Sequence, residues 1–431
     1  MSGHSFEAMN QGRALFEISG YKHHEVTYAA EIYDKTTNYN SSSQLLKKCK
    51  QFLYVHRVKP SSSAKGKVLD GELIKAFTGK VINLIEKKEV NIISTFYLDP
   101  HAYVANQAKL YAEKVLGRKL VTAQKAVGSD ILSSIGNHLR DGQGKLILLQ
   151  LLESDLIFAV SQYTKDKVLE YSKKILPPEA HLKIASRLEV LYAPFDNDFY
   201  GQRNLKQIQI LKNKFKIKEG SRIISYFGRL FPEKGVEDLI RAYYQLQSYF
   251  SDLNLVIGGQ GIETSRLKRL VRELGVKGVS FAGGVSDEEK RAIMQMSILG
   301  VIPTKPISNF VETLCISALE YQASGTPLLT TKVGGVPEAA GSHSLYAKHS
   351  NPTDLALNIS KVLNHQVDLD GIKLQGQRHV EQFNYFKITK RFLQKSMQKL
   401  EQKRSKRVTI GPTVAWLIPA LPIGYGKRYK I

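Results

Sequence analysis

Residues 222–235 read RIISYFGRLFPEKG, a stretch that joins an apolar β-branched run to a glycine and then to a cationic loop. The run predicts a buried strand that ends at Gly228, and the pattern after the loop predicts a helix. Backbone N–H groups at the start of that helix, together with Arg229 and Lys234, would form an anion site. Taken alone, a surface loop with two ordinary cations explains the stretch as well.

Predicted strands alternate with predicted helices along the 431 residues, and this alternation predicts an α/β fold with parallel sheets covered by helices. The predicted strands of the first half are 24–30, 51–57, 90–97, 119–124 and 156–160. Those of the second half are 222–227, 253–258, 278–282, 298–302 and 327–331. Two doubly wound domains that face each other across a cleft are the simplest architecture, with ligands at the carboxyl ends of the strands.

The strongest chemical pattern is NFVETLCISALE at residues 309–320. Glu312 precedes a predicted helix and Glu320 follows eight residues later, so both carboxylates can lie on one side of it. Such a pair accepts hydrogen bonds from vicinal hydroxyl groups, while the amides of residues 313–316 would face a phosphate. The alternative is that Glu312 caps the helix dipole and Glu320 is solvated.

Two glycine-containing stretches complete the pattern. Residues 257–261 read IGGQG, by itself only a tight turn between a strand and a helix, and residues 323–338 read ASGTPLLTTKVGGVPE. In this order, the stretches strongly resemble the retaining glycosyltransferases of family 4, which have the GT-B fold of two Rossmann-like domains. The resemblance covers residues 222–345 closely and the first half more loosely.

The resemblance implies a role for each matching residue. Arg229 and Lys234 would hold the diphosphate of a nucleotide-sugar donor and stabilise the leaving group. Glu312 would bind hydroxyls of the donor sugar, and Glu320 would bind the ribose hydroxyls. The remaining donor-binding residues would be Gly228, Gly259, Phe281, Gly283, Val285, Leu314, Cys315 and Ile316. No metal or other cofactor is expected, because the cations and the helix dipole would neutralise the leaving diphosphate.

The resemblance also implies a division of the chain. Residues 1–195 would form the acceptor-side domain, 196–204 a linker, and 205–375 the nucleotide-sugar donor domain. Residues 376–407 would form a basic helix that crosses back to the first domain, followed by a tail over 408–431. The acceptor would be a carbohydrate, a lipid-linked molecule or a small molecule.

One departure concerns the first domain. Family members carry a His-Gly-Ser-Asp-like element whose histidine lies over the donor sugar, whereas residues 126–130 here read AVGSD. Val127 occupies the histidine slot, and its side chain does not donate a hydrogen bond. His101, at the end of the preceding strand, is the candidate catalytic replacement; the alternative is a helix-start histidine without a catalytic task. The glycine loop and acceptor side would comprise Gly3, Gly128, Ser129 and Asp130.

A second departure concerns topology. Family members begin with a strand that is central in the first sheet, whereas this sequence begins at the glycine loop that follows it. Residues 413–426, TVAWLIPALPIGYG, resemble that missing strand and its loop. We expect residues 413–418 to pair between the strands at 24–30 and 90–97, as in a circular permutation. The alternatives are a misplaced start codon with an unrelated tail, or a truncated second module.

Charge and composition limit the possible partners and the cellular location of the protein. The net charge is +23, and residues 376–431 contain thirteen basic residues against two acidic ones. The apolar stripe of the last helix predicts docking into a core, with adsorption to an anionic membrane surface as the functional alternative. Nucleic acid is not expected as a partner, because no recognition module is present. The sequence has two cysteines and no long apolar run, which predicts a cytoplasmic protein. The alternative is a peripheral position on the inner face of a membrane.

Three functions therefore compete. The first is a retaining, metal-independent glycosyltransferase of the hexosyltransferase type that uses a nucleotide diphosphate-sugar. The second is a non-catalytic relative that binds nucleotide-sugars, which Val127 favours and the intact Arg229, Lys234, Glu312 and Glu320 oppose. The third is another GT-B chemistry, such as a phosphorylase or an epimerase, which the two-glutamate element disfavours.

Overall fold

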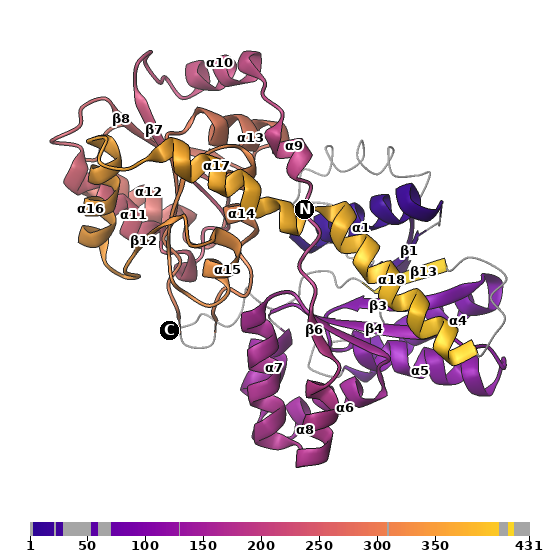
Figure 1. The fold of residues 1–431 in the computed structure, drawn as a ribbon. Coiled ribbons are helices and arrows are strands. Elements are labelled where there is room, and N and C mark those ends of the chain that lie inside the picture. Colours follow the sequence, from indigo (N-terminus) through magenta and orange to yellow (C-terminus); the bar gives the residue numbers. More distant parts are fainter. Residues whose placement is uncertain are drawn as a thin grey trace. The chain divides into compact units, whose positions relative to one another are not determined.

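The computed structural model describes residues 3–20, 23–28, 53–58, 70–128, 130–307, 310–404 and 413–417. The chain forms two compact units, Met1–Phe195 together with Tyr385–Ile431, and Asp196–Asn384. Each unit is an α/β structure on one parallel sheet, so the predicted fold class is confirmed (Figure 1). Predictions for Ser129, for residues 408–412 and for residues 418–431 lie outside the described residues.

The first unit contains a seven-stranded sheet in the order β2-β1-β13-β3-β4-β5-β6. Its strands are β1 (His23–Tyr28), β2 (Leu53–Val58), β3 (Val90–Phe96), β4 (Val121–Ala126), β5 (Leu156–Ala159), β6 (Leu188–Val190) and β13 (Thr413–Leu417). The five strands predicted in the first half of the sequence are all present. The three-residue β6 at the edge was not predicted, because so short a run has no readable period.

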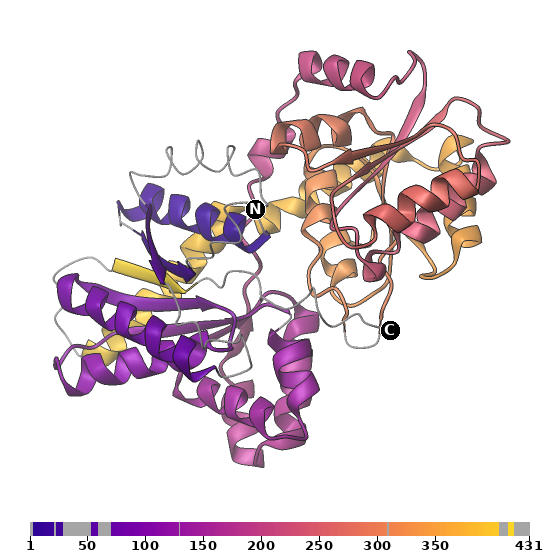
Figure 2. The ribbon, with the colours of Figure 1, turned by 180° about the vertical axis from the view of Figure 1, so that it is seen from behind.

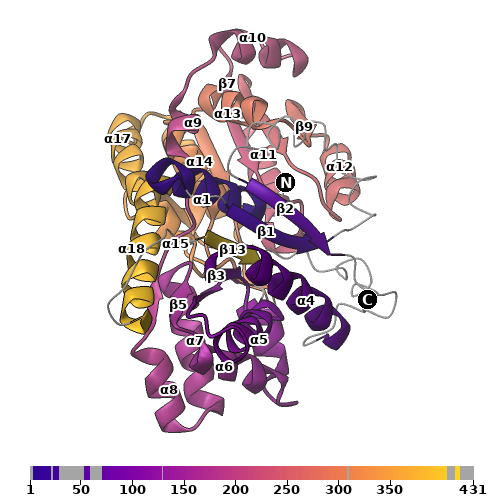
Figure 3. The same ribbon diagram turned by 90° about the vertical axis from the view of Figure 1, so that its right-hand side faces the viewer.

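The central strand of this sheet comes from the tail. β13 pairs in parallel with β1, where Val414 lies opposite His23, and with β3, where Leu417 lies opposite Thr95. Figures 2 and 3 show it in the colour of the C-terminal region, between β1 and β3. The predicted pairing is therefore confirmed for residues 413–417; its interpretation as a circular permutation stays a prediction. The strand supplies hydrogen-bond partners that both neighbours need in a buried parallel sheet.

Helices bury the faces of this sheet in two apolar clusters. The larger helices of the unit are α1 (Gly3–Ser19), α4 (Gly71–Lys87), α5 (His101–Lys114), α6 (Gln143–Glu153), α7 (Gln162–Ile175), α8 (Pro178–Ala185) and α18 (Tyr385–Arg404). One cluster joins α4 and α5 to β3 around Phe77 and Ile93. The other joins α6 and α7 to β5 around Leu148 and Val168. A π-helical turn, η1 (Asp130–Ile135), and the 3₁₀ turn η2 (Gly136–His138) follow β4.

The last helix docks into the first unit through its apolar stripe, which contains Phe392, Leu393, the half-buried Met397 and Leu400. Its cations also bind this unit: Lys403 Nζ lies 3.1 Å from Asp155 Oδ1, and Lys395 Nζ lies 2.8 Å from Glu189 Oε1. Residues 376–404 of the predicted helix belong to two helices, α17 (Leu369–Val380) and α18, because Asn384 between them has a non-helical backbone with ψ 127°. Part of the basic excess therefore forms structural ion pairs.

The second unit contains a six-stranded sheet in the order β12-β11-β10-β7-β8-β9. Its strands are β7 (Arg222–Phe227), β8 (Leu253–Gly258), β9 (Val279–Gly283), β10 (Leu299–Ile302), β11 (Leu328–Thr331) and β12 (Leu345–Ala347). The chain runs outward from β7 to β9 and then returns past β7 to β10. The switch point between β7 and β10 is where a doubly wound sheet binds ligands. All predicted strands are present, and only the three-residue β12 was not predicted.

Helices cover both faces of the second sheet. They are α9 (Asn197–Gly201), α10 (Leu205–Lys214), η3 (Pro232–Lys234), α11 (Val236–Leu246), α12 (Thr264–Glu273), α13 (Asp287–Met296), α14 (Ile316–Ala323), α15 (Val336–Ala340), α16 (Pro352–Leu363), α17 (Leu369–Val380) and η4 (Glu381–Phe383). The core joins β7, β8 and β10 to α11 and α16 around Tyr243 and Ile359. No helix in the described part of the chain combines the length and apolar character needed to cross a bilayer.

Candidate functional site

The predicted donor residues of the second unit gather at the carboxyl ends of its strands. The loop after β7 carries Gly228, Arg229 and Lys234, and the long loop after β10 leads to Glu312 and the start of α14. These two loops are held together, because Lys305 N–H donates to the Glu233 carbonyl at 2.9 Å. The site is therefore built at the switch point between β7 and β10, where the strand order places it.

The glycine cluster after β8 allows two loops to pack backbone against backbone. Leu230 N–H donates to the Gln260 carbonyl at 3.0 Å, and Gly259 N–H donates to the Gly283 carbonyl at 2.8 Å. Gly259 has φ 115°, and a β-carbon there would overlap the Gly228 carbonyl oxygen. The glycines that were a weak pattern in the sequence therefore fix the shape of the loop that carries Arg229.

A second pair of glycines supports the loop that carries Glu312. Gly335 N–H donates to the Glu312 carbonyl at 2.8 Å. A β-carbon at Gly334 would overlap that same carbonyl oxygen, and one at Gly335 would overlap the Thr313 carbonyl oxygen. The VGG sequence before α15 is thus explained by close approach to the backbone at the first glutamate of the pair.

The charged side chains of these loops are paired. The Lys234 ammonium forms an ion pair with the Glu312 carboxylate, and the two side chains are only 13% and 15% exposed. Arg229 lies 3.7 Å from Glu233 and stacks over the Phe231 ring at 4.9 Å. Arg229 is half-exposed, so its guanidinium is accessible to an anion. A cation and a hydroxyl acceptor in contact fit a ligand whose phosphate is bonded directly to a sugar.

Glu320 has two partners that the sequence did not reveal. Its Oε1 accepts from the Tyr200 hydroxyl at 2.6 Å and from Lys290 Nζ at 2.7 Å. Glu320 is nearly buried on α14, so it is not the solvated carboxylate of the alternative interpretation. Tyr200 lies in the predicted linker and Lys290 on an ordinary amphipathic helix. No local pattern marks either residue, because they reach Glu320 only through tertiary packing.

The start of α14 presents backbone N–H donors next to buried side chains. Cys315 is the residue just before the helix, and its side chain and that of Leu314 are buried. Burial, followed by the nearby charge of Glu312, raises the pKa of the Cys315 thiol to about 12, so the thiol stays protonated. The first N–H groups of a helix lack intrahelical acceptors, which leaves them available to an anion. Ile316 begins the helix.

The predicted nucleobase edge lies at the end of β9, which contains Phe281 and Gly283. Phe281 is partly buried, and Lys268 Nζ lies 5.7 Å from the centre of its ring. Gly283 has φ 68°, a conformation that favours glycine, and Val285 follows in the loop before α13. This edge lies beside the glycine turn after β8, to which β9 is paired.

The predicted residues of the first unit serve its internal structure. His101 begins α5 with 1% of its surface exposed and packs edge-to-face on Phe77, with 5.5 Å between ring centres. Asp130 is buried, and its carboxylate accepts N–H bonds from Gly128 at 2.7 Å and from Leu98 at 3.0 Å. Val127 is buried as well. Gly3 begins α1. These contacts favour the alternative of a structural helix-start histidine; the catalytic role of His101 stays a prediction.

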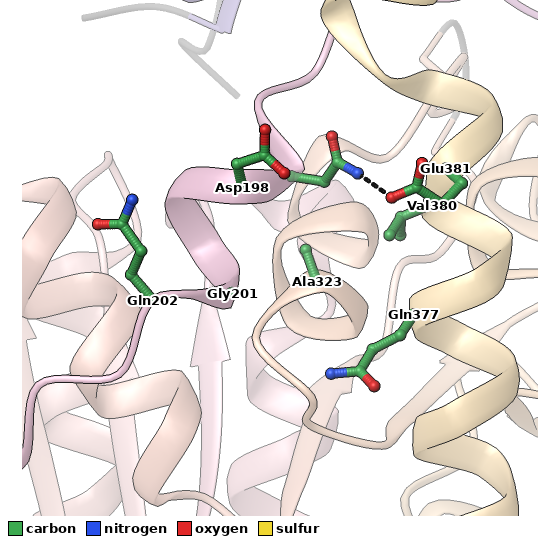
Figure 4. Close-up of a pocket in the computed structure, with 8 residues that line it drawn as sticks. Asp198, Gly201, Gln202, Ala323, Gln377, Val380 and Glu381 are labelled. Atoms are coloured by element: carbon green, nitrogen blue, oxygen red, sulfur yellow. Dashed lines mark hydrogen bonds between the residues drawn. The ribbon is translucent and has the colours of Figure 1, made fainter.

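A hollow of about 440 Å³ in the second unit lies apart from these residues (Figure 4). The dashed line that ends on Glu381 is its hydrogen bond with Asn197. The residues that line the hollow are Asn197, Asp198, Gly201, Gln202, Ala323, Gln377, Val380 and Glu381. None of them is a predicted donor residue, so the chemistry of the switch point, and not this hollow, defines the candidate site.

A protein-family model matches part of the second unit. Residues 207–378 match the family model described as Glycosyl transferases group 1. The match lies within the second unit and contains every predicted residue of the donor side.

Several curated proteins are similar over longer stretches. N-acetyl-alpha-D-glucosaminyl L-malate synthase of Bacillus anthracis is 23% identical over 263 residues, which is 61% of this chain and 62% of that protein. A GDP-mannose-dependent alpha-(1-6)-phosphatidylinositol monomannoside mannosyltransferase of Mycobacterium tuberculosis is 26% identical over 263 residues, 59% and 61% of the two chains. The matched part of this chain thus spans less than two thirds of the length of these relatives.

Solved structures share the fold over most of the chain. The crystal structure of a glycosyltransferase from Rickettsia africae ESF-5 has a TM-score of 0.70 at 16% identity and covers 94% of this chain and 96% of that one. HepE of Anabaena in complex with UDP has a TM-score of 0.66 at 17% identity, covering 88% and 100%. These likenesses confirm the predicted GT-B fold of two parallel-sheet domains.

Proposed function

We propose that this chain, whose residues 207–378 match the group 1 glycosyl transferases, transfers a sugar from a nucleotide diphosphate-sugar to an acceptor. The observation that carries the proposal is the Lys234–Glu312 ion pair at the switch point, beside the start of α14. In a nucleotide diphosphate-sugar, the distal phosphate is bonded to the anomeric carbon. A cation for the phosphate and an acceptor for the sugar hydroxyls must therefore lie side by side, as these two groups do.

The proposed reaction breaks the bond between the anomeric carbon and the phosphate oxygen, and forms a bond from that carbon to an acceptor oxygen. The acceptor hydroxyl gives its proton to the departing phosphate oxygen. Arg229, Lys234 and the amides at the start of α14 would stabilise the charge that develops on the leaving diphosphate. Because these fixed donors neutralise the charge, we propose that the reaction needs no metal, and the family resemblance supports retention of configuration.

The test is a panel of UDP- and GDP-sugars incubated with the purified chain, with release of the nucleoside diphosphate as the readout. Among solved structures of similar fold, HepE of Anabaena was crystallised with UDP-glucose, and the mycobacterial relative is named as GDP-mannose-dependent, so both bases belong in the panel. We expect release from at least one donor in the presence of EDTA, and a loss of about 100-fold in the Glu312→Ala variant. No release and no nucleotide binding across the panel would overturn the proposal.

A second candidate is a non-catalytic protein that binds nucleotide-sugars. The observation that favours it is the buried Val127 in the slot where family members have a histidine. It predicts that a nucleotide-sugar raises the melting temperature of the wild type while neither the wild type nor Glu312→Ala releases nucleotide. We further propose that the protein is cytoplasmic. Exposed cations of α18, such as Lys390, would contact an anionic membrane surface peripherally.

A further inference from the structure

Tyr200, Lys290 and Glu320 form a nearly buried polar cluster that joins three elements of the second unit. Glu320 lies on α14, Lys290 on α13 and Tyr200 on α9. The Tyr200 hydroxyl and Lys290 Nζ both bind Glu320 Oε1, at 2.6 Å and 2.7 Å. Lys290 Nζ also lies 3.2 Å from Asp287 Oδ1 and 5.4 Å from the centre of the Tyr200 ring. The lysine is thus surrounded by two carboxylates and an aromatic ring.

Both donors approach the same oxygen of Glu320. Among the described residues, none donates a hydrogen bond to Oε2. A carboxylate with one oxygen fixed by two donors loses its freedom to rotate, and its other oxygen then points in one direction. Burial disfavours the Lys290 ammonium, but the charges of Glu320 and Asp287 outweigh this and raise its pKa, so Lys290 stays charged. The charged lysine therefore donates a charge-assisted hydrogen bond to Glu320 Oε1.

The backbone that carries Tyr200 is itself fixed to α13. Arg291 donates to the Phe199 carbonyl at 2.6 Å, and its guanidinium stacks on the Phe199 ring at 4.4 Å. Gln295 donates to the Tyr200 carbonyl at 3.0 Å. One helix therefore supplies Lys290 directly and also holds α9 in the position from which the Tyr200 hydroxyl reaches Glu320.

We propose that Tyr200 and Lys290 are positioning residues that aim Glu320 Oε2 at the ribose hydroxyls of the bound nucleotide, so that they determine selectivity for ribonucleotides. This inference rests on the proposed function, in which the ribose lies at Glu320. The chemistry it requires is local: two vicinal hydroxyls donate to a carboxylate whose direction is set by an ammonium and a phenol. The cluster would then contribute to affinity only when those hydroxyls are present.

The test compares UDP and GDP with their 2′,3′-dideoxy forms by isothermal titration calorimetry. Tyr200→Phe keeps the ring and removes the donor, and Lys290→Met keeps the length and removes the charge. We expect each variant to bind the ribonucleotide about tenfold more weakly, as for loss of a hydrogen bond to a charged group, and the dideoxy form within twofold of the wild type. Lys290→Arg should recover part of the loss, because it restores the charge.

Lys214→Met is the matched control: the Lys214 ammonium lies 3.1 Å from Glu289, which is on α13 like Lys290, and within the described part of the chain Lys214 makes no hydrogen bond or ion pair with Glu320. It should leave both affinities unchanged. Equal weakening of both nucleotide forms would show a structural role and overturn the inference, as would unchanged ribonucleotide affinity in both variants. If the wild type binds neither nucleotide, the proposed function itself is overturned. If the wild type prefers the ribonucleotide and the Tyr200 and Lys290 variants keep the same preference, only this inference is overturned.

Discussion

Lys234 and Glu312, 78 residues apart in the sequence, form an ion pair that links the loop after β7 to the loop after β10. Each side chain comes from a separate βα connection, and the glycines at 259 and 334–335 hold the backbone of both connections in close contact with their neighbours. The pair is largely shielded from water, so each side chain holds the other in a fixed orientation. The candidate site is therefore organised before any ligand arrives.

Replacement of Lys234 should impair turnover far more than it lowers the stability of the fold. For Lys234→Met we expect a fall in kcat/KM of about 100-fold, because a fixed cation no longer stabilises the leaving diphosphate. Lys332→Met, which removes an exposed lysine over the Tyr346 ring, is the control and should retain activity. Steady-state kinetics with the best donor of the panel measure both. Activity of Lys234→Met within threefold of the wild type would contradict the assigned role.

Alanine at Gly259 should destabilise the fold and weaken nucleotide binding together. Its β-carbon would overlap the Gly228 carbonyl at a φ of 115°, so the loop that carries Arg229 must move. We expect a loss of more than about 3 kcal/mol in urea unfolding. Gly275→Ala is the matched control: its φ is 61° with open space around it, and it should cost only about 1 kcal/mol. Equal costs for the two variants would show that the close approach is unimportant.

Proline in β13 should unfold the first unit. Ala415 lies opposite His24 on one neighbouring strand and Ile93 on the other. Ala415→Pro removes a backbone donor from a central strand, which should cost about 3 kcal/mol or more, whereas Ala415→Val keeps the donor and favours strand geometry. Thermal unfolding by circular dichroism compares the two. If Ala415→Pro melts at the same temperature as Ala415→Val, the tail does not complete the sheet.

Acid should destabilise the first unit through His101. Burial lowers the pKa of His101 from 6.5 to about 3, offset only in part by the backbone of Asp99. The unfolded chain therefore binds a proton that the folded chain excludes, and stability falls as the pH drops from about 6.5 toward 3. The loss from this group between pH 7 and pH 4 should be about 3 kcal/mol.

His101→Leu should remove most of that dependence, whereas replacing the exposed His349 by leucine should not. Burial also lowers the pKa values of His343 and His379, so a smaller acid loss should remain in the His101 variant. Urea unfolding at a series of pH values gives the result. A pH profile unchanged by His101→Leu would exclude His101 as the source.

Charge reversal on α18 tests the membrane proposal. Lys387 and Lys390 are exposed on the helix, so the double change to glutamate should reduce flotation with vesicles of phosphatidylglycerol and phosphatidylcholine at least tenfold. The same change at Lys348 and Lys361 of the second unit is the control for net charge. Vesicles of phosphatidylcholine alone should bind none of these proteins. Equal flotation of both double variants would assign any binding to net charge and exclude α18 as the contact.

Local patterns in the sequence predicted most of the architecture. Apolar runs followed by glycine or charged loops marked the strands and placed Arg229 and Lys234 after a strand end, and the pattern at residues 309–320 placed Glu312 before a helix and Glu320 on it. The tail strand was also predicted from the sequence, because the apolar run and the glycines of residues 413–426 resemble the first strand and loop of the family. Such features depend on residues that are neighbours in the chain.

Contacts between distant residues were decided only by the tertiary structure. Nothing near Tyr200 or Lys290 in the sequence indicates that both bind one oxygen of Glu320, and the pairing of Lys234 with Glu312 depends on two separate loops. His101 looked available at a strand end, yet packing against Phe77 buries it. The sequence by itself thus determined the elements and the positions of the loops, because periodicity and turn chemistry are local. Only the folded chain decided which side chains meet, because those contacts depend on the packing of helices and strands that the sequence separates.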